Sequence, residues 1–330
     1  MTTRGKKKSI EEELARLSEL GRGPLDDAAG QELTRTIERG SSLVVARAAR
    51  IVKDRTLPGY HKTLDAAFRR FLDNPVKTDP GCNAKLACLE ALDATDTTDP
   101  EPFQIATRHV QKEGAWGPPV DTAVHIRARS VRALAHMGHV DLFLYAGELL
   151  GDPEPPVRQA AAEALAHSGD RNGAGLLLLA AARVDEDPVI LTSYYSALLE
   201  LAADFGLPRL RALLRGSSAD LRELAAIALG QSGLEPAATA LVEAMEATPL
   251  AAERVVCIRA LGLHRTDRAL GVLCDLVTDG PPADAEAAVK SLAARRFDKG
   301  VREKVAALVA ARGSLRLSQA FDEAFADDAD

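Results

Sequence analysis

Apolar and small residues recur along this chain in a pattern that repeats about every thirty-one residues. Each copy begins with an aliphatic anchor, often followed directly by a base, and carries a small residue four positions later and then Ala-Leu. The clearest copies begin at Ile126, Val157 and Leu221. Because the spacings i, i+4, i+7 and i+8 fall on one face of an α-helix, each copy predicts an amphipathic helix.

The leucine that closes each copy marks the period. It occurs at Leu134, Leu165, Leu198, Leu229, Leu261 and Leu292, which gives intervals of 31, 33, 31, 32 and 31 residues. Glycines at 138, 169 and 233 predict turns, and a second apolar helix follows, as in residues 176–179 and 210–214. A single helical hairpin cannot bury its apolar face, so neighbouring hairpins must stack. The pattern therefore predicts an all-α fold, an α-solenoid of helical hairpins.

The period also predicts how the chain is organised. Residues 1–40 are expected to be N-terminal capping helices, 41–125 irregular hairpins with an insertion loop, 126–312 a regular repeat array, and 313–330 an acidic C-terminal tail. The last ten residues carry five acids and no base, which is typical of a frayed or disordered end. No Ser/Gly-rich linker divides the 330 residues, so one elongated domain is expected.

Composition narrows the class of protein. The longest apolar run, about residues 174–182, is far shorter than the roughly 20 residues that span a membrane. The N-terminus lacks the apolar region of a signal peptide, and the four cysteines include no C-x-x-C pair. We therefore expect a soluble cytoplasmic protein without structural zinc. Cys88 and Cys257 stand at small-residue positions of the repeat and are expected to pack in the core.

Charge argues against general nucleic-acid binding, because the net charge is −7 and the sequence pI about 5.6. One local exception is basic. Between Arg47 and Arg70 seven bases face two acids. Solvated helix faces explain such a run, and a patch for an acidic partner or a phosphate is the alternative.

A row of bases follows the anchors of the repeat. It consists of Arg127, Arg158, Arg222 and Arg254, with Lys85 earlier in the chain. The structural interpretation is a ladder in which each guanidinium binds helix-end carbonyls or an acid such as Asp152, Asp187 or Asp220. A row of anion-binding donors is the alternative. Leu191 and Ala285 interrupt the row, which favours the structural interpretation.

The period fails between Leu92 and Leu134, where the interval is 42 residues. The excess lies in residues 113–123 and contains Trp116, the only tryptophan of the chain. Insertions in solenoids map to loops, often on the binding face. We therefore predict a partner-binding site built from Trp116, Asp121, His109 and Gln111. In the alternative, Trp116 plugs the groove between two hairpins, while Asp121 and Thr122 cap a helix that begins near Val124.

The run from Asp152 to Leu165, followed by Gly169-Asp170, resembles the HEAT-like repeat of the type also found in phycobilin lyases. The resemblance covers about residues 126–312 well and the first third loosely. It implies a right-handed superhelix of helical hairpins that holds another macromolecule. Arrays of this kind serve as scaffolds, adaptors, chromophore lyases and DNA glycosylases, so the resemblance indicates a fold more than a function.

The sequence offers no residues for catalysis. No H-E-x-x-H motif or acid–histidine pairing accompanies His136 and His139 in the sequence, and no nucleophile elbow, P-loop or dinucleotide fingerprint occurs. Our hypothesis is a non-enzymatic scaffold or adaptor, without cofactor, that binds a protein through its concave face or the Trp116 loop. The alternative is a phycobilin-lyase-like enzyme or a nucleic-acid-modifying protein. The sequence leaves the oligomeric state open.

Overall fold

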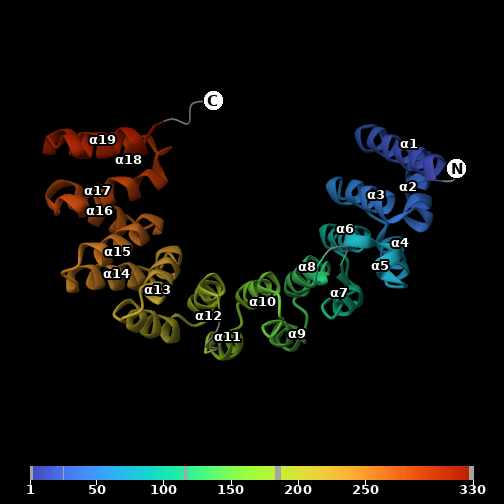
Figure 1. Ribbon diagram of the computed structural model, residues 1–330, viewed down its shortest axis with the longest axis horizontal. Helices are drawn as coiled ribbons and strands as arrows, with labels where there is room; N and C mark the ends of the chain where they lie inside the picture. Colours follow the sequence, from blue (N-terminus) through green and yellow to red (C-terminus); the bar gives the residue numbers. More distant parts are fainter. Residues whose placement is uncertain (1–2, 25, 115–116, 183–186, 327–330) are drawn as a thin grey trace. The chain divides into compact units, whose positions relative to one another are not determined.

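The computed structural model describes residues 3–24, 26–114, 117–182 and 187–326, with side chains from Ile10 onward. These residues form nineteen α-helices, three short 3-10 helices and one two-stranded hairpin, so the predicted all-α fold of helical hairpins is confirmed (Figure 1). The chain divides into two compact units, residues 1–168 and 169–330, where the sequence predicted one elongated domain. Within the described ranges, no helix has both the length and the apolar character needed to cross a bilayer.

In unit 1 the chain runs through α1 (Thr3–Arg22), α2 (Asp27–Arg39), α3 (Ser42–Asp54), α4 (His61–Arg70), α5 (Pro75–Thr78), η1 (Pro80–Cys82), α6 (Asn83–Ala94), α7 (Glu101–Ala106), β1 (Lys112–Glu113), β2 (Val120–Asp121), α8 (Val124–His136), α9 (Leu142–Leu149) and α10 (Pro155–Ser168). The first helices of successive hairpins pack on one another, α3 on α6, α6 on α8 and α8 on α10. The second helices α4, α7 and α9 lie against them. The apolar core of unit 1 is therefore shared between hairpins, as a repeat of this kind requires.

Unit 2 contains η2 (Arg171–Gly173), α11 (Ala174–Ala181), α12 (Pro188–Leu214), α13 (Ala219–Gln231), α14 (Glu235–Ala247), α15 (Ala251–Leu263), α16 (Asp267–Asp279), α17 (Pro282–Leu292), η3 (Ala293–Arg295), α18 (Lys299–Arg312) and α19 (Leu315–Ala324). Its first helices α13, α15, α17 and α19 also contact one another in series. α12 differs from the prediction, because the two expected helices continue into each other through a kink at Ala202 (φ −153°, ψ 67°).

The marker leucines form the predicted core. All six, at 134, 165, 198, 229, 261 and 292, are buried. The turn glycines Gly138, Gly169 and Gly233 have φ of 61°, 64° and 66°, the left-handed conformation that glycine adopts without a steric penalty. Cys88 and Cys257 are buried free thiols in the core, as expected. The register assigned from the sequence is therefore confirmed for the repeat array.

The prediction of a frayed C-terminus is wrong for residues 321–326. α19 packs on α17 and buries Leu317 and Ala320, and the ring of Phe325 is buried and stacked on that of Phe321 with 4.6 Å between centroids. These apolar side chains recur with helical spacing beneath the acids, so the acidic face of α19 turns to solvent while the other face completes the core. Residues 327–330 lie outside the described residues.

Two glycines of unit 2 differ in how closely a neighbouring helix approaches them, so replacement by alanine should change the free energy of unfolding in opposite directions. A Cβ at Gly230, on α13, would lie 2.4 Å from the backbone oxygen of Ala260 on α15, whereas one at Gly271, inside α16, would meet nothing within 4 Å. We expect Gly230→Ala to lower the free energy of unfolding by about 1–3 kcal/mol through overpacking. Gly271→Ala should raise it by up to about 1 kcal/mol, because alanine favours a helix interior. Urea denaturation measures both, and equal shifts would contradict the packing described.

Candidate functional site

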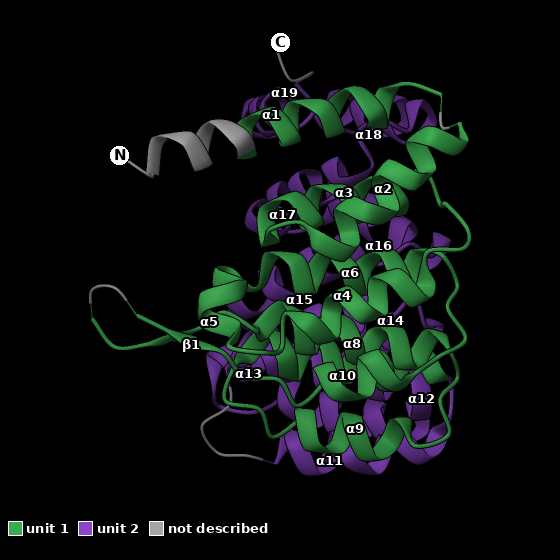
Figure 2. Cartoon of the chain, turned by 90° about the vertical axis from the view of Figure 1, so that its right-hand side faces the viewer, with its two compact units in different colours: residues 1–168 green, residues 169–330 purple. Residues whose placement is uncertain are grey.

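The insertion that breaks the repeat forms a β-hairpin between α7 and α8. β1 and β2 pair antiparallel, with Lys112 opposite Asp121 and Glu113 opposite Val120. The Thr122 amide extends the ladder by donating to the Gln111 carbonyl at 2.8 Å. Figure 2 shows the hairpin leaving the helices of unit 1 near β1. The apolar Val120 is 67% exposed on it, so the hairpin presents apolar surface to solvent.

The carboxylate of Glu113 fastens β1 to the rest of unit 1. Its Oε1 accepts hydrogen bonds from the Gly81 backbone amide at 2.8 Å, the Thr122 hydroxyl at 2.7 Å and the Gln111 side-chain Nε2 at 2.6 Å. Gly81 stands in a left-handed turn (φ 72°) that precedes α6. One acceptor therefore joins both strands of the hairpin to a turn more than thirty residues earlier.

Beneath that turn lies a fully buried ion pair. The side chains of Lys85 and Asp79 are both 0% exposed, with 3.1 Å between Nζ and Oδ2. Asp79 also accepts from the amides of Ala84 and Lys85 at 3.0 Å each, and so caps α6. The Gln111 side chain donates to the Asp79 carbonyl at 3.0 Å. A buried charge is tolerated when it is paired and hydrogen-bonded, and these contacts satisfy both groups while they hold the base of the hairpin.

Arg127 ties the other end of the hairpin to the next repeat. This side chain, 2% exposed, donates to Asp152 from Nε at 2.7 Å and from Nη2 at 3.1 Å. Its Nη1 donates to Asp121 at 2.8 Å and to the His109 carbonyl at 2.9 Å. Burial alone would lower the pKa of Arg127, but the two carboxylates raise it, so the guanidinium keeps its charge.

The structure brings three of the predicted partner-binding residues together, but they face inward. Gln111 is buried, the side chain of Asp121 is nearly so, and burial lowers the pKa of the half-buried His109. Asp121 accepts at 2.9 Å from the amide of Ala123, the N-cap residue of α8. This is a turn contact before the helix, and not the helix cap considered as the alternative. These residues hold the base of the hairpin, and their predicted role in partner binding stays a prediction. Trp116, the fourth predicted residue, lies outside the described residues.

The predicted row of bases makes contacts of the structural kind. Besides Arg127 with Asp152, Arg158 donates to the carbonyls of residues 152 and 153, Arg222 pairs with Glu253 at 3.0 Å, and Arg254 pairs with Asp284 at 2.7 Å. Asp187, which was expected in this ladder, caps its own helix by accepting from the Val189 amide. The acids of unit 2 instead come from the start of the following first helix.

The basic stretch from Arg47 to Arg70 is largely engaged within unit 1. Lys53 pairs with Glu90, Arg69 pairs with Asp65 and Glu101, Arg55 donates to the Gly23 carbonyl, and Arg70 donates to the Gly40 carbonyl. These contacts engage part of the run within the fold, while Arg50 and Lys62 are exposed to solvent.

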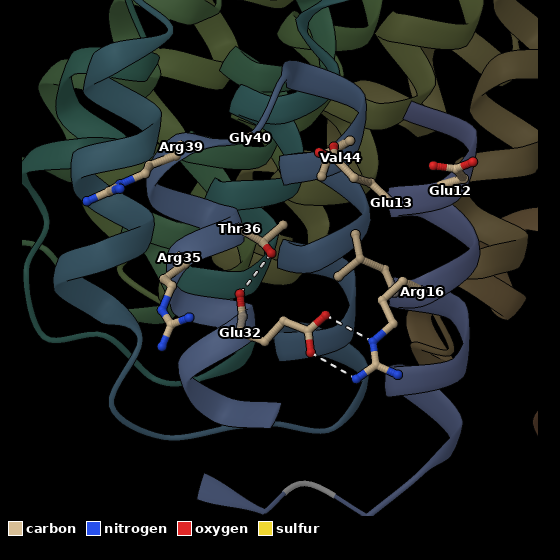
Figure 3. Close-up of a pocket in the computed structure, with 10 residues that line it drawn as sticks. Glu12, Glu13, Arg16, Glu32, Arg35, Thr36, Arg39, Gly40 and Val44 are labelled. Carbon is tan, nitrogen blue, oxygen red and sulfur yellow. Dashed lines mark hydrogen bonds and ion pairs between the residues drawn. The ribbon is translucent and has the colours of Figure 1, made fainter. Parts of the chain in front are cut away.

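A pocket of about 440 Å³ opens between α1, α2 and α3 (Figure 3). The guanidinium of Arg16 on α1 makes two hydrogen bonds to Glu32 on α2, of 3.0 and 3.1 Å, across this space. Three acids and three arginines line it: Glu12, Glu13, Glu32, Arg16, Arg35 and Arg39. Their charges cancel, so the pocket has no net attraction for an ion.

The buried cysteines are poorly suited to act as nucleophiles. Burial raises the pKa of the Cys88 thiol to about 12 and that of Cys257 to about 11, so neither is a thiolate at neutral pH. Across the described ranges, no three His, Cys, Asp or Glu side chains converge as metal ligands would. Asp79, Gly81 and Glu113 were not among the site residues predicted from the sequence. The Asp-Pro-Gly turn at 79–81 is the signal that could have pointed to the first two.

Removal of the Glu113 carboxylate should loosen the hairpin. We expect Glu113→Ala to raise amide exchange in residues 110–122 and to lower the free energy of unfolding by about 1–3 kcal/mol, because three donors lose their acceptor. Hydrogen exchange followed by mass spectrometry measures this. Glu163→Ala, which removes a surface acid on α10, is the control and should leave exchange of the hairpin unchanged. Equal exchange in both variants would show that Glu113 does not hold the hairpin.

The Glu113 carboxylate should also make the stability of the hairpin depend on pH. Burial acts to raise the pKa of Glu113, but hydrogen bonds from Thr122, Gly81 and Gln111 outweigh it, so the pKa lies below its ordinary value. A carboxyl with a depressed folded pKa stabilises the fold above its unfolded pKa, about 4.3, and loses this effect as the pH falls through the folded value. Exchange of the hairpin should therefore speed up, relative to the helices, only below about pH 4.

Comparisons with known proteins agree with the repeat. The family model of HEAT repeats matches residues 121–199, and no curated protein matches the chain. Among solved structures, the CpcE and CpcF complex of phycocyanin lyase from Nostoc sp. PCC7120 is 18% identical, with 88% of this chain and 96% of that chain covered and a TM-score of 0.37. Human deoxyhypusine hydroxylase in complex with glycerol is 17% identical, with 96% of each chain covered and a TM-score of 0.29.

Neither of these structural likenesses supports an activity for this chain, because both TM-scores are low. The family match covers α8 to α11 and the first part of α12, and it includes the copies of the repeat that begin at Ile126 and Val157. The predicted resemblance is confirmed there, and the chain carries HEAT repeats over residues 121–199.

Proposed function

We propose that this chain is a non-enzymatic scaffold that holds a protein partner through the hairpin between α7 and α8. The observation that carries the proposal is the contrast between the two ends of this hairpin. Its base is a buried network of paired charges and hydrogen bonds. Exposed to solvent are Val120 on β2, the Pro118-Pro119 pair that precedes β2, and Val110 just before β1.

This contrast favours binding for a physical reason. A two-stranded hairpin is at best marginally stable in water by itself, so its order here depends on the base. A contact element that is already ordered loses less conformational entropy when a partner binds. Exposed valine and proline side chains supply apolar area with few rotamers to restrict. The hairpin thus has the properties of a preorganised docking element.

The same network argues against chemistry at this place. Each charged side chain of the network has a charged partner within the fold and is buried out of reach of a substrate. These side chains are Asp79, Lys85, Asp121 and Arg127. Within the described residues, no observation favours the lyase-like or nucleic-acid-modifying alternative, so we propose a role in binding only.

Site-specific photo-cross-linking tests the proposal. Val120→p-benzoylphenylalanine places the probe on the hairpin, and the same substitution at Val140, 86% exposed beside the α8–α9 turn, is the matched control. We expect the probe at position 120 to give one defined protein adduct in native cell extract and the probe at 140 to give none. The adducted protein is then purified and titrated against the unmodified chain. Identical adducts from both positions, or no binding on titration, would refute the proposal.

A further inference from the structure

A groove crosses the first helices α15, α17 and α19 of unit 2. It has a volume of about 530 Å³. Its lining includes small residues, Gly262, Ala283, Ala287, Ser291 and Ala294. A Cβ at Gly262 would lie 2.7 Å from the Ser291 Cβ, so α15 and α17 approach closely beneath the groove. Small side chains on both helices leave a trough rather than a ridge at the surface.

Charge in this groove differs from that of the whole chain. Arg259, Lys290 and Arg316 line it with one acid, Glu286, a local balance of 3 − 1 = +2 in a chain of net charge −7. Glu286 accepts from Lys290 Nζ at 2.7 Å and pairs with Arg316, which holds two cations of different helices side by side. Side-chain hydrogen bonding from Lys290 lowers the pKa of Glu286, so this arrangement persists at neutral pH.

Arg259 is the free cation of the groove. It is exposed on α15, and no acid of the described chain pairs with it. An arginine guanidinium binds a carboxylate through two parallel hydrogen bonds. Because Arg259 has no internal partner, no ion pair within the protein has to break when a ligand binds it. Lys290 and Arg316 keep further donors exposed, because each uses only part of its donor set on Glu286.

We infer that this groove binds an acidic segment of a protein partner, in an extended conformation along the trough. The cations are spread over three helices with a carboxylate between them, which suits spaced acidic side chains. A nucleic-acid backbone carries a charge at every nucleotide and would place phosphates against Glu286. The surface lies in unit 2, so the inference does not depend on the hairpin of unit 1.

Fluorescence anisotropy with defined probes tests the inference. The probe is a fluorescein-labelled peptide of alternating glutamate and glycine, compared with the same peptide carrying glutamine in place of glutamate. We expect saturable binding of the glutamate peptide to the full-length chain, weaker binding as the salt concentration rises, and no binding of the glutamine peptide. Arg259→Glu should lower the affinity by about tenfold or more, because it places a like charge against the peptide.

Arg268→Glu is the control, since it makes the same change of charge at an exposed position on α16 that does not line the groove. Both variants should melt like the parent. Equal loss of affinity in the two variants would overturn the inference in favour of net charge alone. Tighter binding of a labelled oligothymidylate than of the glutamate peptide would overturn it in favour of a nucleic-acid surface. Failure here would leave the cross-linking result at the hairpin unaffected.

Discussion

Arg127→Ala is expected to lower the free energy of unfolding by about 3–5 kcal/mol at neutral pH. The guanidinium is buried between Asp121 and Asp152, and its loss leaves two nearly buried carboxylates without a counter-charge. Urea denaturation measures the effect. Arg132→Ala on the same helix removes only a surface pair with Glu163, and should cost no more than about 1 kcal/mol.

The pH dependence of this variant has a defined sign. Burial acts to raise the pKa of Asp121, but the Ala123 amide, Arg127 and the Gln111 amide together lower it. The resulting stabilisation is present above the unfolded pKa, about 3.9, and is lost as the pH falls through the folded value. Without Arg127 the buried carboxyl can become neutral in acid, so the cost of the substitution should shrink below about pH 4. A cost below 1 kcal/mol at neutral pH, or one that grows in acid, would contradict this account.

Leu165→Asp should be at least as damaging, with a loss of about 4 kcal/mol or more. Leu165 is fully buried on α10, which packs on α8, so the variant removes shared apolar contacts and buries a carboxylate without a partner. Leu144→Asp makes the same change at an exposed position on α9, and should shift the stability by no more than about 0.5 kcal/mol. Similar urea midpoints for the two variants would show that the repeat register is wrong.

Much of the fold could be predicted from the sequence, because the helices and turns of the repeat depend on residues that are close together in the chain. The small and apolar residues within each copy recur with the period of a helix, and Leu134 and its counterparts recur with the period of the repeat. Each copy therefore indicates the same buried face. The turns at Gly138, Gly169 and Gly233 require a residue in the left-handed conformation. Glycine at these positions therefore indicates the turns directly in the sequence. The kink at Ala202 carries no such mark, since neither glycine nor proline stands there.

The hairpin and its base could not be predicted in the same way. Strands of two residues are too short to show alternation, so β1 and β2 leave no periodic trace. The contacts of the base join residues far apart in the chain, as between Gly81 and Glu113 or between Arg127 and Asp152. The broken period located the insertion correctly, but whether Asp121 and Gln111 face a partner or the interior depends on these long-range contacts.

The proposal that the hairpin docks a protein is tested most directly by the affinity of the cross-linked partner for a shortened hairpin. Replacement of residues 114–119 by Asn-Gly leaves Glu113, Val120 and the base in place, and closes the strands with a two-residue turn. We predict that this variant melts like the parent, while titration calorimetry shows a loss of binding of about 2 kcal/mol or more. Unchanged melting together with unchanged affinity would contradict the proposal, and the partner site would then lie on the helices.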